Sequence, residues 1–271
     1  MSTHPEQAPM TVKKLLEMKQ AGEKIACLTA YDTSFARMLD DCGVDLVLVG
    51  DTLGMVIQGH DTTLPVTVDD MIYHGRAVAR GLQHALLVLD MPFMSDASVA
   101  TAVETAGRFM KQAGAQMVKL EGGADQRELV TELTRLGIPV CAHLGLQPQR
   151  VFKLGGYRVQ GRQQSQAERI LEDARILEQA GADMLLLECV PTELARQITE
   201  QASVPVIGIG AGRACDGQIL VLYDILGITP GRLPKFAHNF MRQAEDIPAA
   251  IKNYVQAVKS GDFPDSAHSF K

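Results

Sequence analysis

Two stretches of the chain, QAGAQMVKLE at residues 112–121 and QAGADMLLLE at residues 179–188, are almost identical. A looser copy, DCGVDLVLVGD, occupies residues 41–51. In each copy the end of a helical pattern meets a glycine suited to a left-handed helix cap, and an apolar run follows. Repeated helix–glycine–strand units predict parallel strands that are joined by crossover helices.

Short apolar runs with the composition of strands buried on both faces recur along the whole chain. Segments with helical spacing separate them, for example 99–113 and 167–180, and 245–260 is expected to close the fold as an outer helix. An eighth strand is expected near 218–222, after a connection that is short for a crossover helix. We therefore expect an α/β fold, a (β/α)8 barrel, in preference to a doubly wound sheet. The other predicted strands are 25–30, 46–50, 86–90, 117–121, 140–144, 184–188 and 206–209.

The composition is that of a globular protein, with 46% hydrophobic and 21% charged residues in 271. This length suits one barrel, so we expect a single domain over residues 1–271 with a flexible N-terminus at residues 1–10. The net charge of −6 argues against nucleic acid or an anionic membrane as the main partner. No apolar run is long enough to cross a membrane, and the five cysteines form no CxxC pair, so we expect a cytoplasmic protein with reduced cysteines.

Ionisable residues stand at the ends of five consecutive predicted strands: Asp51, Asp90, Glu121, His143 and Glu188. In a parallel barrel these ends converge on one mouth, where active sites lie. Four carboxylates in one mouth would repel each other, and a divalent cation is the simplest compensation. Oxygen ligands favour a hard ion, which points to Mg²⁺.

A structural role is the alternative for each of these residues. Asp51 could cap a turn beside Thr52, and Asp90 could stabilise the turn that follows it. His143 could be a core histidine bonded to the backbone, and Glu188 could pair with an arginine. The coincidence at five strand ends favours a functional mouth over these separate explanations.

Lys119 is the one cation inside a predicted strand. A period of two places it on the same strand face as Glu121, so Glu121 is expected to supply part of its compensation and an anionic substrate the rest. The alternative is a purely structural buried pair. Farther along, GGYRVQGR at residues 155–162 has the composition of a mobile lid over the mouth, or of a plain surface loop.

From about Thr11 to the C-terminus, a series of motifs in one order resembles the ketopantoate hydroxymethyltransferase family. The motifs are VGDTLGMVIQGHDTTLPVT (49–67), LDMPFM (89–94), MVKLEGG (117–123), HLGLQPQ (143–149), GGYRVQGR (155–162), LLLECVP (186–191), PVIGIGAG (205–212), DGQILV (216–221), PKFA (234–237) and the tail from 263 to 270.

This resemblance implies a barrel of the phosphoenolpyruvate mutase and isocitrate lyase type. It implies transfer of a hydroxymethyl group from 5,10-methylenetetrahydrofolate to 3-methyl-2-oxobutanoate, through an enolate stabilised by Mg²⁺. The product would be 2-dehydropantoate, for pantothenate and coenzyme A biosynthesis. Family members assemble as homodecamers.

The resemblance also implies roles for single residues. It makes Asp51, Asp90 and Glu121 the metal positions, the last acting through water, and Glu188 the catalytic base. Asp51, Thr52, Asp90, Lys119 and His143 correspond to residues that contact the substrate or line its site. The family usually has serine where this chain has Thr52, so the hydroxyl is kept and a methyl group is added.

Two other functions stay open on the sequence alone. One is a Mg²⁺-dependent carbon–carbon lyase or mutase of the related barrel family, although the KKCGH-like loop typical of those enzymes is absent from the sequence. The other is an inactive paralogue, for which Thr52 is the possible sign and the retained acids are the counterargument.

Overall fold

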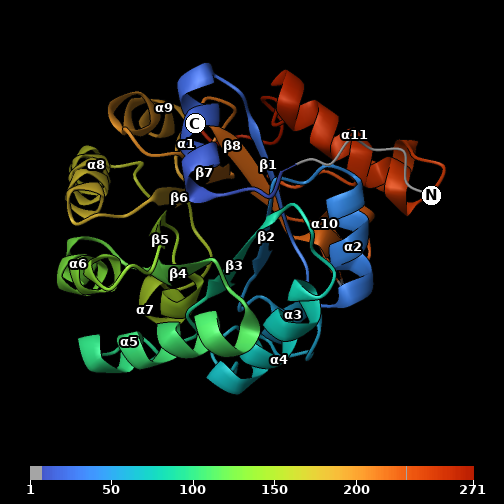
Figure 1. The fold of residues 1–271 in the computed structure, drawn as a ribbon. Helices are drawn as coiled ribbons and strands as arrows, with labels where there is room; N and C mark the ends of the chain where they lie inside the picture. Colours follow the sequence, from blue (N-terminus) through green and yellow to red (C-terminus); the bar gives the residue numbers. More distant parts are fainter. Residues whose placement is uncertain (1–7, 230) are drawn as a thin grey trace.

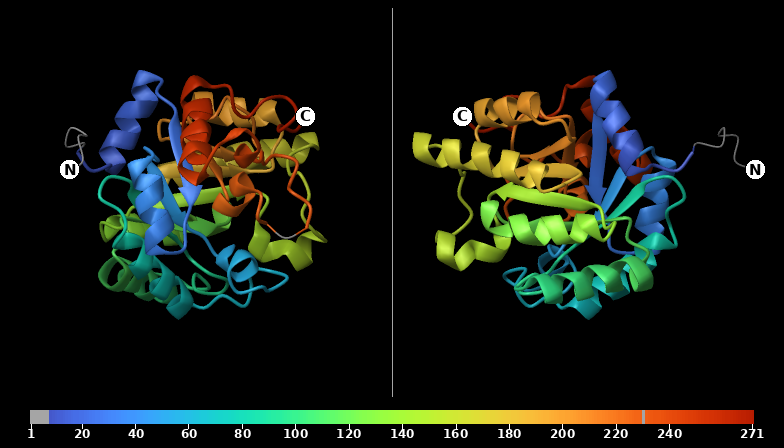
Figure 2. Two further views of the ribbon diagram at one scale, coloured as in Figure 1. Left: turned by 90° about the vertical axis from the view of Figure 1, so that its right-hand side faces the viewer. Right: turned by 60° about the vertical axis from the view of Figure 1, so that its left-hand side comes forward.

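The computed structural model of the chain describes residues 8–229 and 231–271 (Figure 1). Eight parallel strands close into a barrel in the order β1 to β8, and β8 pairs with β1. Helices surround the strands on the outside, as the views in Figure 2 also show. The predicted (β/α)8 barrel is therefore confirmed.

The elements have the following bounds. The strands are β1 (Ile25–Thr29), β2 (Leu46–Val49), β3 (Leu86–Asp90), β4 (Met117–Glu121), β5 (Val140–Gly145), β6 (Met184–Glu188), β7 (Val206–Ile209) and β8 (Gly217–Leu220). The α-helices are α1 (Val12–Ala21), α2 (Thr33–Asp41), α3 (Leu53–Val56), α4 (Val68–Ala79), α5 (Val99–Arg108), α6 (Arg127–Arg135), α7 (Val151–Leu154), α8 (Gln164–Gln179), α9 (Thr192–Gln201), α10 (Leu222–Leu226) and α11 (Ile247–Ser260).

Two predicted elements differ in detail from the structure. The eighth strand begins at Gly217 and ends at Leu220, and the short connection before it contains no helix. The helix expected over 99–113 is α5 followed by a π-helical turn, Phe109–Ala113. Both ends of that segment, Phe109 and Ala113, are buried in the core.

The glycines of the repeated junction have the predicted conformation. Gly43, Gly114 and Gly181 follow their helices with φ of +85°, +76° and +106°. Residues with a Cβ rarely adopt these angles, so glycine lets the chain turn sharply from helix into strand. The repeat in the sequence is thus a repeat of backbone geometry.

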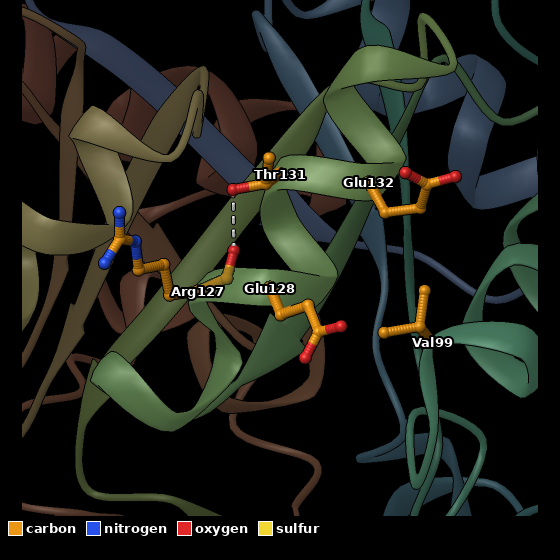
Figure 3. Close-up of a pocket in the computed structure, with 5 residues that line it drawn as sticks. All are labelled: Val99, Arg127, Glu128, Thr131 and Glu132. Atoms are coloured by element: carbon orange, nitrogen blue, oxygen red, sulfur yellow. Dashed lines mark hydrogen bonds between the residues drawn. The ribbon is translucent and has the colours of Figure 1, made fainter.

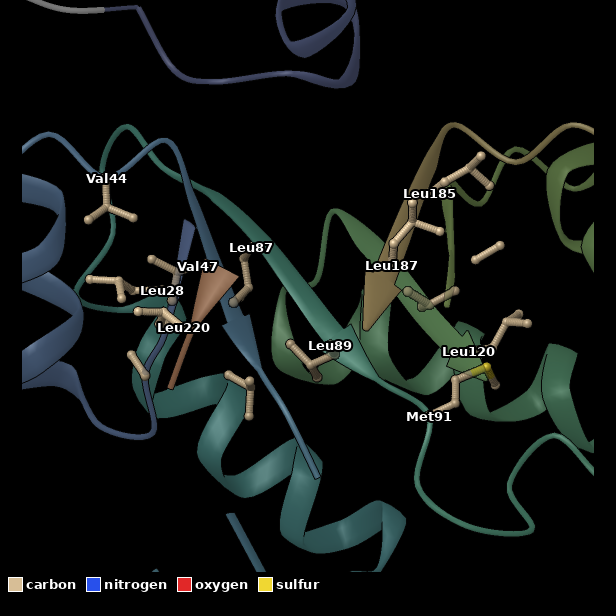
Figure 4. Close-up of a cluster of buried hydrophobic side chains, with 14 of the residues drawn as sticks. Leu28, Val44, Val47, Leu87, Leu89, Met91, Leu120, Leu185, Leu187 and Leu220 are labelled. Carbon is tan, nitrogen blue, oxygen red and sulfur yellow. The ribbon is translucent and has the colours of Figure 1, made fainter. Parts of the chain in front are cut away.

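The inside of the barrel is filled by every second residue of each strand, as a period of two requires. The inner side chains are apolar over the lower layers of the barrel: Ile25, Cys27, Leu46, Leu48, Leu86, Val88, Met117, Cys141, Met184, Leu186, Ile207 and Ile219. The alternate residues face the helices and form the larger core, part of which Figure 4 shows. All five cysteines are free, as expected.

Helix α1 closes the end of the barrel at which the strands begin. Its buried Leu15 and Met18 pack with the inner side chains, and so does Met10 before it. Lys19 pairs with Asp216, just before β8, at 2.6 Å. Of the predicted flexible N-terminus, residues 1–7 lie outside the described residues, whereas the Met10 N–H donates to the carbonyl of His84 at 2.6 Å. Only the other end of the barrel is left for a ligand.

None of the helices in residues 8–229 and 231–271 combines the length and the apolar character needed to cross a membrane.

The seam between the first and last strands is fastened by Tyr254 of α11. Its side chain is fully buried, and its hydroxyl lies 2.8 Å from the carbonyl oxygen of Cys27 and 2.9 Å from that of Gln218. One residue outside the barrel thus reaches both strands at which the sheet closes.

We expect Tyr254→Phe to lower the free energy of unfolding by about 1–2 kcal/mol, because the single hydroxyl hydrogen that two buried carbonyl oxygens share is lost. Urea unfolding at one fixed protein concentration measures this. The control is Tyr73→Phe, since Tyr73 is 73% exposed and should change little. Equal stabilities for the two variants would contradict the role of the Tyr254 hydroxyl.

Candidate active site at the carboxyl ends of the strands

Above the apolar layers, the inward-facing positions of four neighbouring strands, β3 to β6, become ionisable. Asp90 of β3 lies opposite Lys119 of β4, and Glu121 lies opposite His143 of β5. Glu188 ends β6 beside Gly145, and Asp51 follows β2 after one glycine. We call these residues the strand-end cluster: Asp51, Asp90, Lys119, Glu121, His143 and Glu188. The structure therefore brings together the predicted site residues at one mouth.

Lys119 forms its ion pair with Asp90, at 2.6 Å between Nζ and Oδ2. Both side chains are almost completely buried. Glu121 supplies part of the compensation for Lys119, as expected, but the ion-pair partner is Asp90, which lies directly across in the neighbouring strand. The N–H of Asp51 also points to Asp90 Oδ2, at 3.4 Å.

His143 lies between two carboxylates. Its Nδ1 is 3.5 Å from Glu121 Oε1, and its Nε2 is 3.3 Å from Glu188 Oε2. These are ion-pair distances and are longer than good hydrogen bonds, so neither ring nitrogen has a hydrogen-bond partner among the described residues. The two structural alternatives, a backbone-bonded His143 and an arginine partner for Glu188, do not describe this arrangement.

The backbone around Glu188 is held by its neighbours. The Leu146 N–H donates to the carbonyl of Glu188 at 2.8 Å. Gly145 permits this approach, since a Cβ there would lie 2.3 Å from the same carbonyl oxygen. The next residue, Cys189, has φ of +49°, and its carbonyl accepts from the N–H of Gln160 at 2.9 Å. The two backbone hydrogen bonds and the strained conformation of Cys189 therefore fix the Cα position from which the Glu188 side chain extends.

Burial and mutual repulsion control the charges of the acids. Burial raises the pKa of Asp51, and neighbouring Asp90 raises it further. Burial also raises the pKa of Asp90, although Lys119 acts in the opposite direction. For Glu121 burial opposes ionisation, but the contact with His143 lowers its pKa overall.

The two basic groups respond to the same carboxylates. Burial acts to lower the pKa of Lys119, but the charges of Asp90, Glu121 and Asp51 outweigh it and raise the pKa above its usual value. Burial and Lys119 act to lower the pKa of His143, while contacts with Glu121 and Glu188 raise it to about 9. Both groups are therefore cationic at neutral pH.

The strand-end cluster carries more negative than positive charge. Its four carboxylates meet one ammonium and one imidazolium, which leaves two negative charges uncompensated when all groups are ionised. Asp90 Oδ1 and Glu121 Oε1 are buried without a hydrogen-bond partner in the described part of the chain. An unpaired buried carboxylate oxygen is costly, and a cation would relieve that cost.

In the described residues, no three His, Cys, Asp or Glu side chains are arranged so that together they could hold a metal ion. Mg²⁺ does not require such a cage, because it commonly binds one or two carboxylates and completes its shell with water and substrate. Neighbouring Asp51 and Asp90 fit that smaller requirement, with an orphaned oxygen on Asp90.

Gln149 is the site residue that the sequence analysis did not single out. It lies in the loop after β5, is 8% exposed, and donates from Nε2 to Asp51 Oδ2 at 2.9 Å. Its backbone N–H donates to Glu121 Oε2 at 3.2 Å. The only signal for it was its place in the motif HLGLQPQ, because an uncharged side chain gives no electrostatic reason to suspect it.

Thr52 and the predicted lid lie at the edge of the mouth. Thr52 is half-buried at the start of α3 and makes no side-chain cap hydrogen bond, so its hydroxyl does not serve the helix. Tyr157 of the lid segment approaches Met55 Sδ at 3.8 Å through its hydroxyl. Burial raises the pKa of Tyr157, and the charges of Glu188 and Asp51 raise it further. Mobility of this segment remains a prediction.

A separate hollow lies elsewhere on the molecule. A groove of about 570 Å³ runs between α5 and α6 on the outside of the barrel, lined by Val99, Arg127, Glu128, Thr131 and Glu132 (Figure 3). The Thr131 hydroxyl donates a hydrogen bond to the carbonyl oxygen of Arg127 at 2.9 Å. The groove contains none of the strand-end residues and no buried charge, so its size alone does not make it the reactive site.

Comparison with known proteins agrees with the geometry. A family model described as ketopantoate hydroxymethyltransferase matches residues 9–266. The 3-methyl-2-oxobutanoate hydroxymethyltransferase of Alkalilimnicola ehrlichii is 60% identical over 262 residues, which cover 97% of this chain and 95% of the relative.

Solved structures show a related fold at low identity. A putative phosphonomutase from Burkholderia cenocepacia has a TM-score of 0.63 and 17% identity, covering 80% of this chain and 95% of that one. A 2,3-dimethylmalate lyase, described as a member of the PEP mutase/isocitrate lyase superfamily, has a TM-score of 0.57 and 18% identity, covering 79% and 81%. At this identity the likeness extends to the barrel type alone, which is the type expected from the sequence.

We expect Lys119→Met to lower the free energy of unfolding by about 3 kcal/mol in the presence of a chelator, because Asp90 would be buried without its cation. Urea unfolding monitored by circular dichroism measures the loss. The double variant Lys119→Met/Asp90→Asn should recover part of it, since the unpaired charge is gone. A single variant as stable as the original chain would show that the pair is not important for stability.

Proposed function

The chain belongs to the ketopantoate hydroxymethyltransferase family, and we propose that the strand-end cluster is its active site. It is an enzyme, a hydroxymethyltransferase that acts on 3-methyl-2-oxobutanoate. The lyase or mutase and the inactive paralogue, the alternatives left open by the sequence, are therefore set aside. The observation that carries the proposal is the convergence of four carboxylates, Lys119 and His143 at the one open end of the barrel.

Asp51 and Asp90 would hold a Mg²⁺ ion, and Glu121 would act on it through water. The support is the uncompensated negative charge, the orphaned Asp90 Oδ1 and the all-oxygen donor set, which a hard ion prefers. When bound, the ion supplies Lewis-acid polarisation of the substrate's carboxylate and keto oxygens.

Lys119, Thr52 and His143 contribute to binding the 2-oxo acid. Lys119 carries a fixed positive charge at the floor of the mouth and neutralises negative charge on the substrate oxygens. The Thr52 hydroxyl is available as a hydrogen-bond donor because it caps no helix. The added methyl group, compared with the family's serine, narrows the space beside it. His143 lines the site from β5.

Glu188 is the base in this proposal. It is the one acid of the cluster that lies on the far side of His143 from the metal positions, and its side chain keeps 16% exposure, so a substrate can reach it. It takes the proton from C3 of 3-methyl-2-oxobutanoate. Carbon C3 then bonds to the methylene carbon carried by 5,10-methylenetetrahydrofolate, the carbon–nitrogen bonds to the folate break, and water supplies the hydroxyl oxygen. The products are 2-dehydropantoate and tetrahydrofolate. His143, protonated near neutral pH, stabilises the Glu188 carboxylate before it accepts the proton.

The remaining expectations belong to the same proposal. The lid segment around Tyr157 would close over both substrates and shield the enolate from bulk solvent. The free cysteines suit the reducing cytoplasm. The homodecamer implied by the family resemblance is tested by sedimentation velocity, where a monomer would contradict it.

We expect Glu188→Gln to slow exchange of the C3 hydrogen of 3-methyl-2-oxobutanoate with deuterium by a factor of about 100 or more, because the amide cannot accept the proton. Proton NMR in deuterated buffer, without folate, measures the exchange. The matched control is Glu193→Gln, an exposed residue five positions away on α9, which should exchange at the original rate. Exchange at the original rate in Glu188→Gln would exclude this residue as the base.

Removal of divalent ions should abolish the same exchange, and added Mg²⁺ should restore it, because the acidity of C3 depends on polarisation of the neighbouring oxygens. The assay is repeated with chelator and then with excess Mg²⁺. Asp51→Asn should need more Mg²⁺ than the unmodified enzyme to reach half its maximal rate. Full exchange in chelator would overturn the metal part of the proposal.

A further inference from the structure

A single residue from the loop after β5 contacts the ends of three other strands. Gln149 Nε2 donates to Asp51 Oδ2 at 2.9 Å, beyond β2, and to the carbonyl oxygen of Met91 at 2.9 Å, beyond β3. Its backbone N–H donates to Glu121 Oε2, at the end of β4, at 3.2 Å. Among the described residues, Gln149 thus connects three segments that are far apart in sequence, and all three border the mouth.

The orientation of the Gln149 amide follows from its partners. A carboxylate oxygen and a carbonyl oxygen only accept hydrogen bonds, so the amide nitrogen, with its two hydrogens, must face them. Both hydrogens are therefore in use, one on Asp51 and one on Met91. The side chain cannot rotate without leaving two acceptors unpaired at a site that is 8% exposed.

These bonds select which carboxylate oxygens remain free. Gln149 takes Oδ2 of Asp51 with its side chain and Oε2 of Glu121 with its backbone. The other oxygen of Glu121, Oε1, is buried and has no hydrogen-bond partner in the described chain. Gln149 thus holds one oxygen of each acid, and the second oxygen of Glu121 faces His143 Nδ1 at 3.5 Å.

We propose that Gln149 is a positioning residue that sets the orientation of the Asp51 carboxylate, so that its Oδ1 faces the cation site. The inference rests on the proposed function, in which Asp51 binds the metal. Hydrogen bonds to the distal atoms of metal ligands fix their orientation, and losing one commonly weakens metal affinity or activity by a factor of about 10–100. Gln149 itself touches neither substrate nor metal in this account.

The test is Gln149→Met. Methionine has nearly the same length but no donor, and the backbone N–H to Glu121 is kept. The dissociation constant of Mn²⁺ for the full-length protein, measured by electron paramagnetic resonance of the free ion, is expected to rise about tenfold or more. In turnover assays the Mg²⁺ concentration for half-maximal rate should rise as well, while KM for 5,10-methylenetetrahydrofolate stays within about twofold, which general damage to the site would not produce.

The matched control is Gln147→Met, in the same loop, whose side chain makes no hydrogen bond in the described residues and which should bind Mn²⁺ as the original chain does. Gln149→Asn serves if the methionine variant fails to fold. It keeps the amide but is too short to reach both acceptors, so its affinity for Mn²⁺ should fall too. Mn²⁺ binding within about threefold of the original in a folded variant overturns the role of Gln149 and leaves the proposed function intact. Absence of Mn²⁺ binding in the original chain overturns both.

Discussion

The buried carboxylates at the mouth of the barrel need charge compensation, and this requirement governs how the neighbouring side chains are arranged. A buried carboxylate is stable only if a cation or a set of donors faces it. The apolar lower layers and helix α1 keep water out from below, so the acids at the strand ends have few ways to be satisfied. Lys119, His143 and Gln149 each face one or more of these carboxylates, but together they do not compensate all of the negative charge.

The negative charge that remains uncompensated is what allows the mouth to bind a cation. Lys119 compensates Asp90, and His143 is shared by Glu121 and Glu188, but the mouth still carries more negative than positive charge. Asp90 Oδ1, which is buried without a hydrogen-bond partner in the described part of the chain, marks where a cation would be stabilising. Protein groups alone thus do not compensate all the carboxylates of the mouth, and a bound cation would complete the compensation. This is the usual sign of a binding site, as opposed to a core that is stable by itself.

Most of the fold could be predicted because its signals are local. The repeated helix–glycine–strand junction, the period of two in each strand and the ionisable strand ends are all visible along the chain, and they placed Asp51, Asp90, Glu121, His143 and Glu188 at one rim. The partner of Lys119 could not be predicted in this way. It depends on register between strands, and Asp90 lies across from it although Glu121 is nearer in sequence.

Gln149 was missed for a related reason. Its importance comes from where a loop folds back over the mouth, and no periodicity encodes that. The π-helical turn Phe109–Ala113 is similar, because one extra residue per turn leaves the apolar pattern of the segment almost unchanged. Features that depend on contacts between distant parts of the chain therefore became visible only in the structure. Features that depend on neighbours along the chain could be predicted from the sequence.

Diffraction from crystals grown with Mn²⁺ can decide whether these acids gather around one cation at the open end of the barrel. An anomalous difference map should show a peak bounded by the carboxylates of Asp51 and Asp90. Crystals of active enzyme with Mn²⁺ in the medium and no peak at these residues, or with the peak in the groove between α5 and α6, would contradict it.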